Sequence, residues 1–118
     1  FRLPKRLPRQ IAMEMLLTGR RMGAAEAQQW GLVNAVVPQV ELMDKAREYA
    51  ATIIQAAPLS IAAVKEVTRA TANLDLEACY ALMRSGELKA YEKMLVSEDA
   101  KEGPKAFAEK REPVWQGR

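Results

Sequence analysis

The chain has 118 residues, of which 49% are hydrophobic and 28% charged, and its formal net charge is +3. This composition is typical of one soluble globular domain. The sequence has no histidine and a single cysteine, Cys79, which excludes histidine acid–base chemistry, an intramolecular disulfide and a cysteine-cluster metal site. No apolar run approaches the ~20 residues of a membrane span, and no signal peptide is recognisable. We therefore expect a cytoplasmic protein without membrane contact.

Basic side chains are concentrated at the N-terminal end. Residues 1–21 carry a net charge of +5, and the rest of the chain carries −2. The basic residues of this segment are Arg2, Lys5, Arg6, Arg9, Arg20 and Arg21. Such an end either stays solvated or binds phosphates of a cofactor or a nucleic acid. We do not expect nucleic-acid binding, because Pro4 and Pro8 interrupt the segment and Phe1 is its only aromatic residue.

Helical periodicity dominates the first half of the chain. It predicts a helix from Arg9 that ends at Gly19, and a short helix after Gly23 that ends near Trp30. Residues 32–37 are apolar and β-branched between a glycine and a proline, which predicts one short strand. Since one strand cannot make a sheet, this segment either pairs outside the chain or is a buried extended connector.

The second half is predicted to be helical throughout. Apolar stripes indicate helices over residues 39–57, 59–72, 76–95 and 98–111, with the last one interrupted near Gly103 and Pro104. Asp75 and Ser97 are the expected N-caps of the last two helices. Residues 114–118 are expected to be extended.

No motif for catalysis or metal binding is present. The chain has no glycine-rich phosphate loop, no nucleophile elbow and no metal-ligand spacing. Glu14, Glu26, Glu48 and Glu66 are predicted to be solvated charges on helices. Cys79 is predicted to be a buried, inert thiol, and the Met and Leu side chains at helical spacing are predicted to form the core.

A series of short segments, in order and at matching spacing, resembles the crotonase (enoyl-CoA hydratase/isomerase) superfamily. The segments are Leu16-Leu17-Thr18-Gly19-Arg20, Glu26-Ala27, Gly31-Leu32-Val33-Asn34, Val36-Val37-Pro38, Ala57-Pro58, Lys65, Ser97-Glu98-Asp99, Glu102-Gly103, Ala106-Phe107, Glu109-Lys110-Arg111 and Pro113. Further residues narrow the resemblance to one branch of that family. They include Arg21-Met22-Gly23, Met83-Arg84-Ser85-Gly86 and Val114-Trp115.

This resemblance implies a mainly α structure, the C-terminal helical portion of the crotonase α/β fold, over residues 1–118. The family's core of stacked β-turns, its oxyanion hole and its catalytic carboxylates are then expected before Phe1. The family hydrates 2-enoyl-CoA thioesters reversibly, with carboxylates that handle water and the α-proton. We therefore expect no catalytic residue in this chain, no metal, no required cofactor, and no activity of the chain alone.

The resemblance also implies a part of the coenzyme A site. The family's A-F-x-E-K-R segment lies near the adenine and phosphate ends of CoA, and its Phe and Lys match Phe107 and Lys110. Alternatively, Phe107 is helix core and Lys110 is solvated. Lys5 and Arg9 are phosphate candidates by charge alone. Expected partners are an acyl-CoA thioester and further copies of the full-length protein, in a trimer or a dimer of trimers.

The rival interpretation is a free-standing helical interaction module that uses its basic N-terminal segment. An unpaired strand and a first residue other than Met favour a piece of a longer protein. A compact monomer in solution would favour the module.

Overall fold

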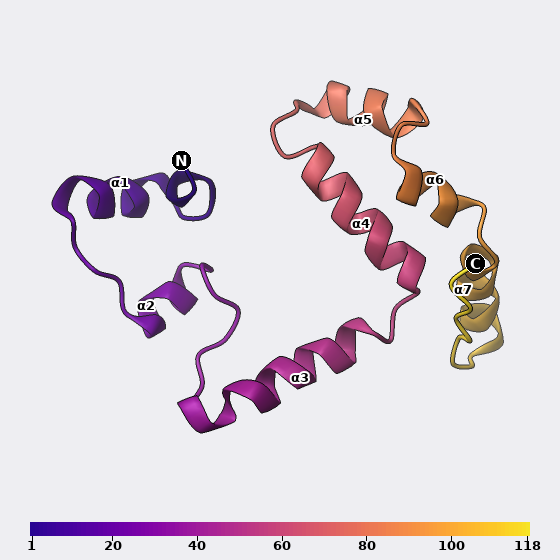
Figure 1. Ribbon diagram of the computed structural model, residues 1–118, viewed down its shortest axis with the longest axis horizontal. Helices are drawn as coiled ribbons and strands as arrows, with labels where there is room; N and C mark the ends of the chain where they lie inside the picture. The colour runs from indigo at the N-terminus through magenta and orange to yellow at the C-terminus, as the bar shows by residue number, and fades with distance from the viewer. The chain divides into compact units, whose positions relative to one another are not determined.

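A computed structural model describes all 118 residues as helices joined by short connections, with no β-strand (Figure 1). The chain divides into two compact units, Phe1–Ala46 and Arg47–Arg118. The mainly α class predicted from periodicity is confirmed.

The first unit contains two short 3₁₀ turns, η1 (Leu3–Lys5) and η2 (Gln39–Glu41), and two α-helices, α1 (Arg9–Thr18) and α2 (Ala24–Gln29). Helix α1 packs on η1, and its Ala12 is fully buried. Gly19 ends α1 in the left-handed conformation (φ 67°) and donates its N–H to the Met15 carbonyl, as a helix C-terminus requires. Gly23 precedes α2 without a side-chain cap. Both predicted helix boundaries are confirmed.

The predicted strand at residues 32–37 is wrong, because this segment forms bends and irregular backbone. The N–H groups of Leu32 and Val33 both donate to the Ala27 carbonyl, at 2.8 and 3.4 Å, which turns the chain at the end of α2. The segment is also not a buried connector, since Leu32, Val33 and Val36 are exposed. A β-branched run favours extended backbone, but a ladder needs a second strand, and the chain contains none.

Helix α3 (Leu42–Ile53) begins in the first unit and continues into the second, which also contains α4 (Pro58–Ala70), α5 (Leu76–Arg84), α6 (Lys89–Leu95) and α7 (Glu98–Glu109). Helices α4 and α6 make the most extensive helix–helix contact. The Glu66 carboxylate of α4 accepts hydrogen bonds from the N–H groups of Ala90 and Tyr91, at 2.8 and 3.0 Å. This side chain therefore caps the N-terminus of α6 from a neighbouring helix.

Three predicted helix boundaries in this unit need correction. The helix expected to reach residue 57 ends at Ile53, and residues 54–56 form a turn. The helix expected over residues 76–95 is two helices, because Gly86 adopts a left-handed conformation (φ 75°) between them. The expected interruption near Pro104 does not occur, and α7 is continuous. Proline lacks an N–H and leaves the Ala100 carbonyl without its helical donor, so contacts elsewhere maintain this helix.

Small residues make up the buried core of the chain. Five of the seven buried hydrophobic residues are alanines, and no large side chain is fully buried. Apolar residues of the predicted helices, such as Leu16, Leu42 and Ile53, are more than half exposed. Cys79 is half-buried rather than buried. Apolar helix faces are thus left open to solvent in this chain, which corrects the expectation of a core rich in Met and Leu.

No single helix is both long enough and apolar enough to cross a membrane. One pair of segments reaches that length and apolarity when taken together, although it is sharply bent between them: Gln39–Ile53 and Pro58–Ala70. No group of three or more His, Cys, Asp or Glu side chains has the geometry to hold a metal ion.

Candidate functional site

The two residues predicted to contact coenzyme A lie at the end of α7, with Phe107 in its last turn and Lys110 directly after it. Ser97 begins this helix as its N-cap, with its Oγ accepting a hydrogen bond from the Ala100 N–H at 3.0 Å. Glu98 and Asp99 follow in the first turn, where negative charge favours the helix N-terminus. The predicted caps Ser97 and Asp75 are both confirmed, since Asp75 accepts from the Ala78 N–H at 2.8 Å.

The helix ends in a left-handed turn centred on Lys110 (φ 53°, ψ 41°). The Lys110 N–H donates to the Phe107 carbonyl at 3.2 Å, and the Arg111 N–H donates to the Ala106 carbonyl at 3.1 Å. These two bonds form a Schellman motif, in which the left-handed position usually holds glycine. The motif reverses the chain, so that residues 111–118 run back beside α7 (Figure 1).

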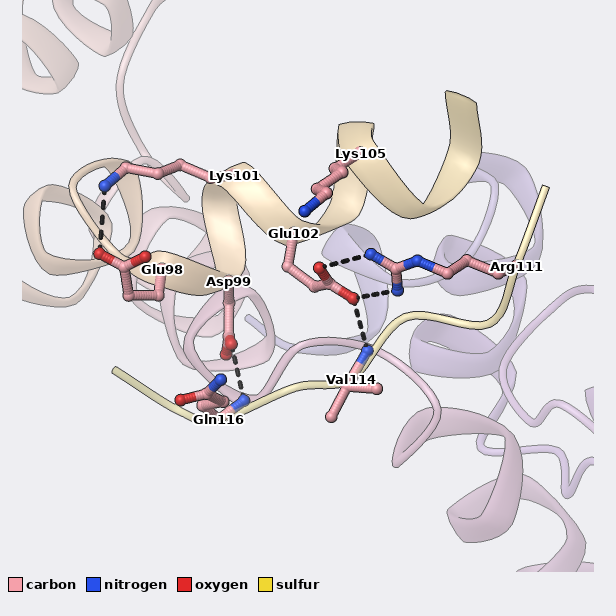
Figure 2. Close-up of a pocket in the computed structure, with 8 residues that line it drawn as sticks. All are labelled: Glu98, Asp99, Lys101, Glu102, Lys105, Arg111, Val114 and Gln116. Atoms are coloured by element: carbon pink, nitrogen blue, oxygen red, sulfur yellow. Dashed lines mark hydrogen bonds and ion pairs between the residues drawn. The ribbon is translucent and has the colours of Figure 1, made fainter. Parts of the chain in front are cut away.

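Two carboxylates of α7 hold the returning tail (Figure 2). Asp99 accepts from the N–H groups of Gln116 and Gly117, at 2.7 and 2.9 Å. Glu102 accepts from the Val114 N–H at 2.9 Å. At the far end of the tail, the Arg118 carbonyl oxygen accepts from the Glu98 N–H at 2.7 Å, at the start of α7.

Trp115 attaches the tail to the turn after α3 as well as to α7. Its indole Nε1 donates to the Gln55 carbonyl in the turn after α3, at 2.7 Å. Its ring lies beside Gly103, where an added Cβ would be 3.4 Å from the ring. A small residue at position 103 therefore allows the indole to approach α7 closely. This contact supports the helix next to Pro104 and leaves Trp115 half-buried.

Arg111 is the electrostatic centre of the helix end. Its guanidinium pairs with Glu102 through two hydrogen bonds, at 2.6 and 2.9 Å, and with Glu109 at 2.6 Å. The hydrogen bonds from Arg111 and from the Val114 N–H lower the pKa of Glu102 to about 2. The same two carboxylates raise the pKa of Arg111. Bidentate Arg–carboxylate pairs fix geometry as well as charge.

A cavity of about 420 Å³ lies between α7 and the tail. Its lining residues are Glu98, Asp99, Lys101, Glu102, Lys105, Arg111, Val114 and Gln116 (Figure 2). Most of its charges are already paired within the chain, since Lys101 binds Glu98 at 3.1 Å and Arg111 binds Glu102. The cavity thus offers neither a carboxylate pair for catalysis nor a set of metal ligands, and its lining includes neither Phe107 nor Lys110.

Phe107 and Lys110 lie three residues apart at the C-terminal end of α7, outside this cavity. The Phe107 side chain is 87% exposed, so it is not part of this chain's core. Lys110 is also exposed. An open aromatic face and an open ammonium thus lie at one helix end. Lys5 and Arg9, predicted by charge alone, lie in the first unit at η1 and at the first residue of α1.

Arg20 organises the connection between α1 and α2. Its guanidinium binds Glu26 at 2.7 and 3.0 Å and Glu14 at 3.0 Å. These hydrogen bonds raise the pKa of Arg20, and the bond from Arg20 lowers the pKa of Glu26. The prediction of solvated charges is therefore wrong for Glu26, whose side chain is 31% exposed, and for Glu66, which caps α6; Glu14 stays half exposed and also pairs with Arg20. Sequence reasoning missed these contacts because their partners lie across a turn or on another helix.

Comparison with known proteins gives consistent matches over the whole chain. The enoyl-CoA hydratase/isomerase family matches residues 1–118. Carnitinyl-CoA dehydratases of Escherichia coli (strain K12) and Proteus mirabilis (strain HI4320) are 60% and 62% identical to the chain over all 118 residues. The crystal structure of enoyl-CoA hydratase from Mycobacterium tuberculosis H37Rv matches 99% of the chain, with a TM-score of 0.83 and 36% identity. The chain spans 45% of the length of each of these three proteins.

Proposed function

The chain belongs to the enoyl-CoA hydratase/isomerase family, and on this premise we propose that it is the C-terminal part of an enzyme that reversibly hydrates an acyl-CoA thioester. The proposed substrate pair is carnitinyl-CoA and crotonobetainyl-CoA. The observation that supports this choice is the 60–62% identity to carnitinyl-CoA dehydratases over all 118 residues. No observation favours the free-standing interaction module.

The proposed reaction adds water across the C2–C3 double bond of a 2-enoyl-CoA, or removes it. It needs carboxylates to handle water and the α-proton, and donors that stabilise the enolate-like thioester oxygen. This proposal assigns no carboxylate of the chain to that chemistry. Five of the fifteen, Glu14, Glu26, Glu66, Asp99 and Glu102, are engaged in internal hydrogen bonds. The role proposed for this chain is to bind substrate and to associate with other copies.

In this proposal Phe107 and Lys110 contact the coenzyme A part of the substrate. The exposed ring of Phe107 suits stacking on adenine, and the Lys110 ammonium suits pairing with a phosphate. We propose that both reach the CoA of a neighbouring subunit in a cytoplasmic trimer or dimer of trimers. Oligomer formation would also cover exposed apolar side chains such as Leu17, Ile54 and Val96.

The test of this activity compares two proteins on two substrates. A full-length enzyme that carries this sequence should hydrate crotonobetainyl-CoA with a higher kcat/KM than crotonyl-CoA. The 118-residue chain alone should show no turnover above a protein-free control. Preference for crotonyl-CoA would overturn the substrate assignment, and turnover by the short chain would overturn the assignment as a non-catalytic part.

The test of the CoA contact is Lys110→Ala in the full-length enzyme. We expect KM to rise at least about fivefold, which corresponds to ~1 kcal/mol, with little change in kcat. The contact is distant from the reacting carbons and equal in ground and transition states, so it affects binding alone. Added salt should shrink the effect. As a control, Lys105→Ala removes the same charge five residues earlier and should leave KM unchanged. If KM is also unchanged in Lys110→Ala, Lys110 is a solvated lysine that does not contact CoA.

A further inference from the structure

Lys110 is the only non-glycine residue of the chain with a positive φ angle. The left-handed region is disfavoured for residues with a Cβ, because the Cβ approaches the following carbonyl oxygen. A lysine by itself would therefore leave this conformation. Such an outlier persists only where surrounding contacts hold it, and these outliers cluster at binding sites.

Two backbone bonds of the Schellman motif hold this turn, and side-chain contacts of Arg111 and Glu102 add to them. Arg111 follows Lys110 directly, and its guanidinium reaches back nine residues to both carboxylate oxygens of Glu102. Glu102 also accepts from the Val114 N–H, four residues after Lys110. The backbone on the C-terminal side of Lys110 is thus attached twice to the same carboxylate on α7. Arg111 additionally binds Glu109, on the N-terminal side of Lys110.

From this arrangement we propose that Arg111 and Glu102 are positioning residues that hold Lys110 in its left-handed conformation and so direct its ammonium toward the phosphate of the bound acyl-CoA. This inference rests on the CoA contact proposed for Lys110. Neither positioning residue needs to touch the substrate. Lysine has a long flexible side chain, so fixing its backbone reduces the conformational freedom that is lost on binding.

Loss of the Arg111–Glu102 pair changes the direction of the Lys110 side chain. Without the Arg111–Glu102 pair, only the two backbone bonds of the Schellman motif hold residue 110, which then relaxes more readily to the right-handed region that its side chain favours. The Cα–Cβ bond of Lys110 then points in a different direction, and the ammonium must be brought to the phosphate at an entropic cost. The affinity for CoA therefore falls, while groups at the reacting carbons keep their places.

The experiment is a double-mutant cycle in the full-length enzyme with acyl-CoA substrate. Arg111→Gln should raise KM about threefold to tenfold with kcat unchanged, and should have no further effect in a Lys110→Ala background. Glu102→Gln is a second route to the same loss, because a neutral amide cannot form the ion pair. Lys101→Gln, which breaks an exposed ion pair on the same helix, is the matched control and should leave KM unchanged.

The possible results separate this inference from the proposed function. A raised KM in Lys110→Ala together with an unchanged KM in folded Arg111→Gln and Glu102→Gln overturns the positioning role and leaves the CoA contact standing. Equal effects of Arg111→Gln with and without the Lys110 side chain also overturn it, because Arg111 then acts independently of Lys110. An unchanged KM in Lys110→Ala overturns both. Partial rescue of KM by Arg111→Lys, which keeps one charged contact, supports the positioning role.

Discussion

The carboxylate of Asp99, only 4% exposed, accepts a hydrogen bond at 2.9 Å from the backbone N–H of Gly117, eighteen residues later. The second carboxylate oxygen accepts from Gln116. One buried side chain near the start of α7 thus satisfies two consecutive N–H groups of an extended tail, which has no ladder partner of its own. A buried carboxylate requires such donors, and each charge-assisted bond is stronger than a neutral one.

Asp99→Ala should release the tail from α7. The loss of each bond to a charged acceptor corresponds to ~1.5–3 kcal/mol of local stability, so amide hydrogen exchange at residues 114–118 should accelerate by at least roughly tenfold to a hundredfold. Peptide-resolved exchange measured by mass spectrometry checks this. Glu98→Ala removes an equal charge from the neighbouring, exposed position and should not change exchange in the tail. Equal protection in both variants would contradict the tethering role.

The Arg111–Glu102 pair should make stability depend on pH in the acid range. The pKa of Glu102 in the folded chain is about 2, below its usual 4.5, so its contribution is complete above about pH 4.5 and disappears as the pH falls through 2. The difference in unfolding free energy between wild type and Glu102→Gln should therefore be constant near neutral pH and shrink steadily below pH 4.5. Urea unfolding at several pH values measures it. A difference that grows on acidification would refute this assignment.

Lys110→Gly should stabilise the chain and weaken substrate binding at the same time. Glycine adopts the left-handed conformation without the Cβ clash but adds entropy to the unfolded state, which leaves a net gain of about 0.5–1 kcal/mol. The melting temperature should rise while KM rises. Lys105→Gly is the matched control, because glycine inside a helix costs about 1 kcal/mol and should lower the melting temperature. A fall in melting temperature for Lys110→Gly would mean that the turn is not strained.

The 118-residue chain by itself should expose apolar surface. No large side chain is fully buried, and side chains such as Leu17, Ile54 and Val96 are at least three-quarters exposed. Patches of this kind favour association. Sedimentation velocity should show self-association, and a hydrophobic dye should gain fluorescence on binding. A monomer that does not increase the fluorescence of the dye would contradict this expectation.

Local chemistry in the sequence was sufficient to predict most helix boundaries. Gly19, Asp75 and Ser97 act on backbone groups within four residues along the chain, so their roles follow from the sequence without knowledge of the fold. The prediction of a strand at residues 32–37 was wrong for the opposite reason. Its β-branched side chains favour extended backbone, but strand formation depends on a partner strand that is remote in sequence.

Family membership was also determined by the sequence alone, because ordered short segments at fixed spacing identify a family without any knowledge of contacts. Tertiary structure decided what the charged residues do. Glu66 caps a helix 24 residues ahead, Asp99 holds the tail, and Glu102 binds Arg111. A carboxylate on a helix surface has the same local sequence signal whether it is solvated or paired. Only chain reversal, at Gly86 and at the left-handed Lys110, brings its partner within hydrogen-bond distance.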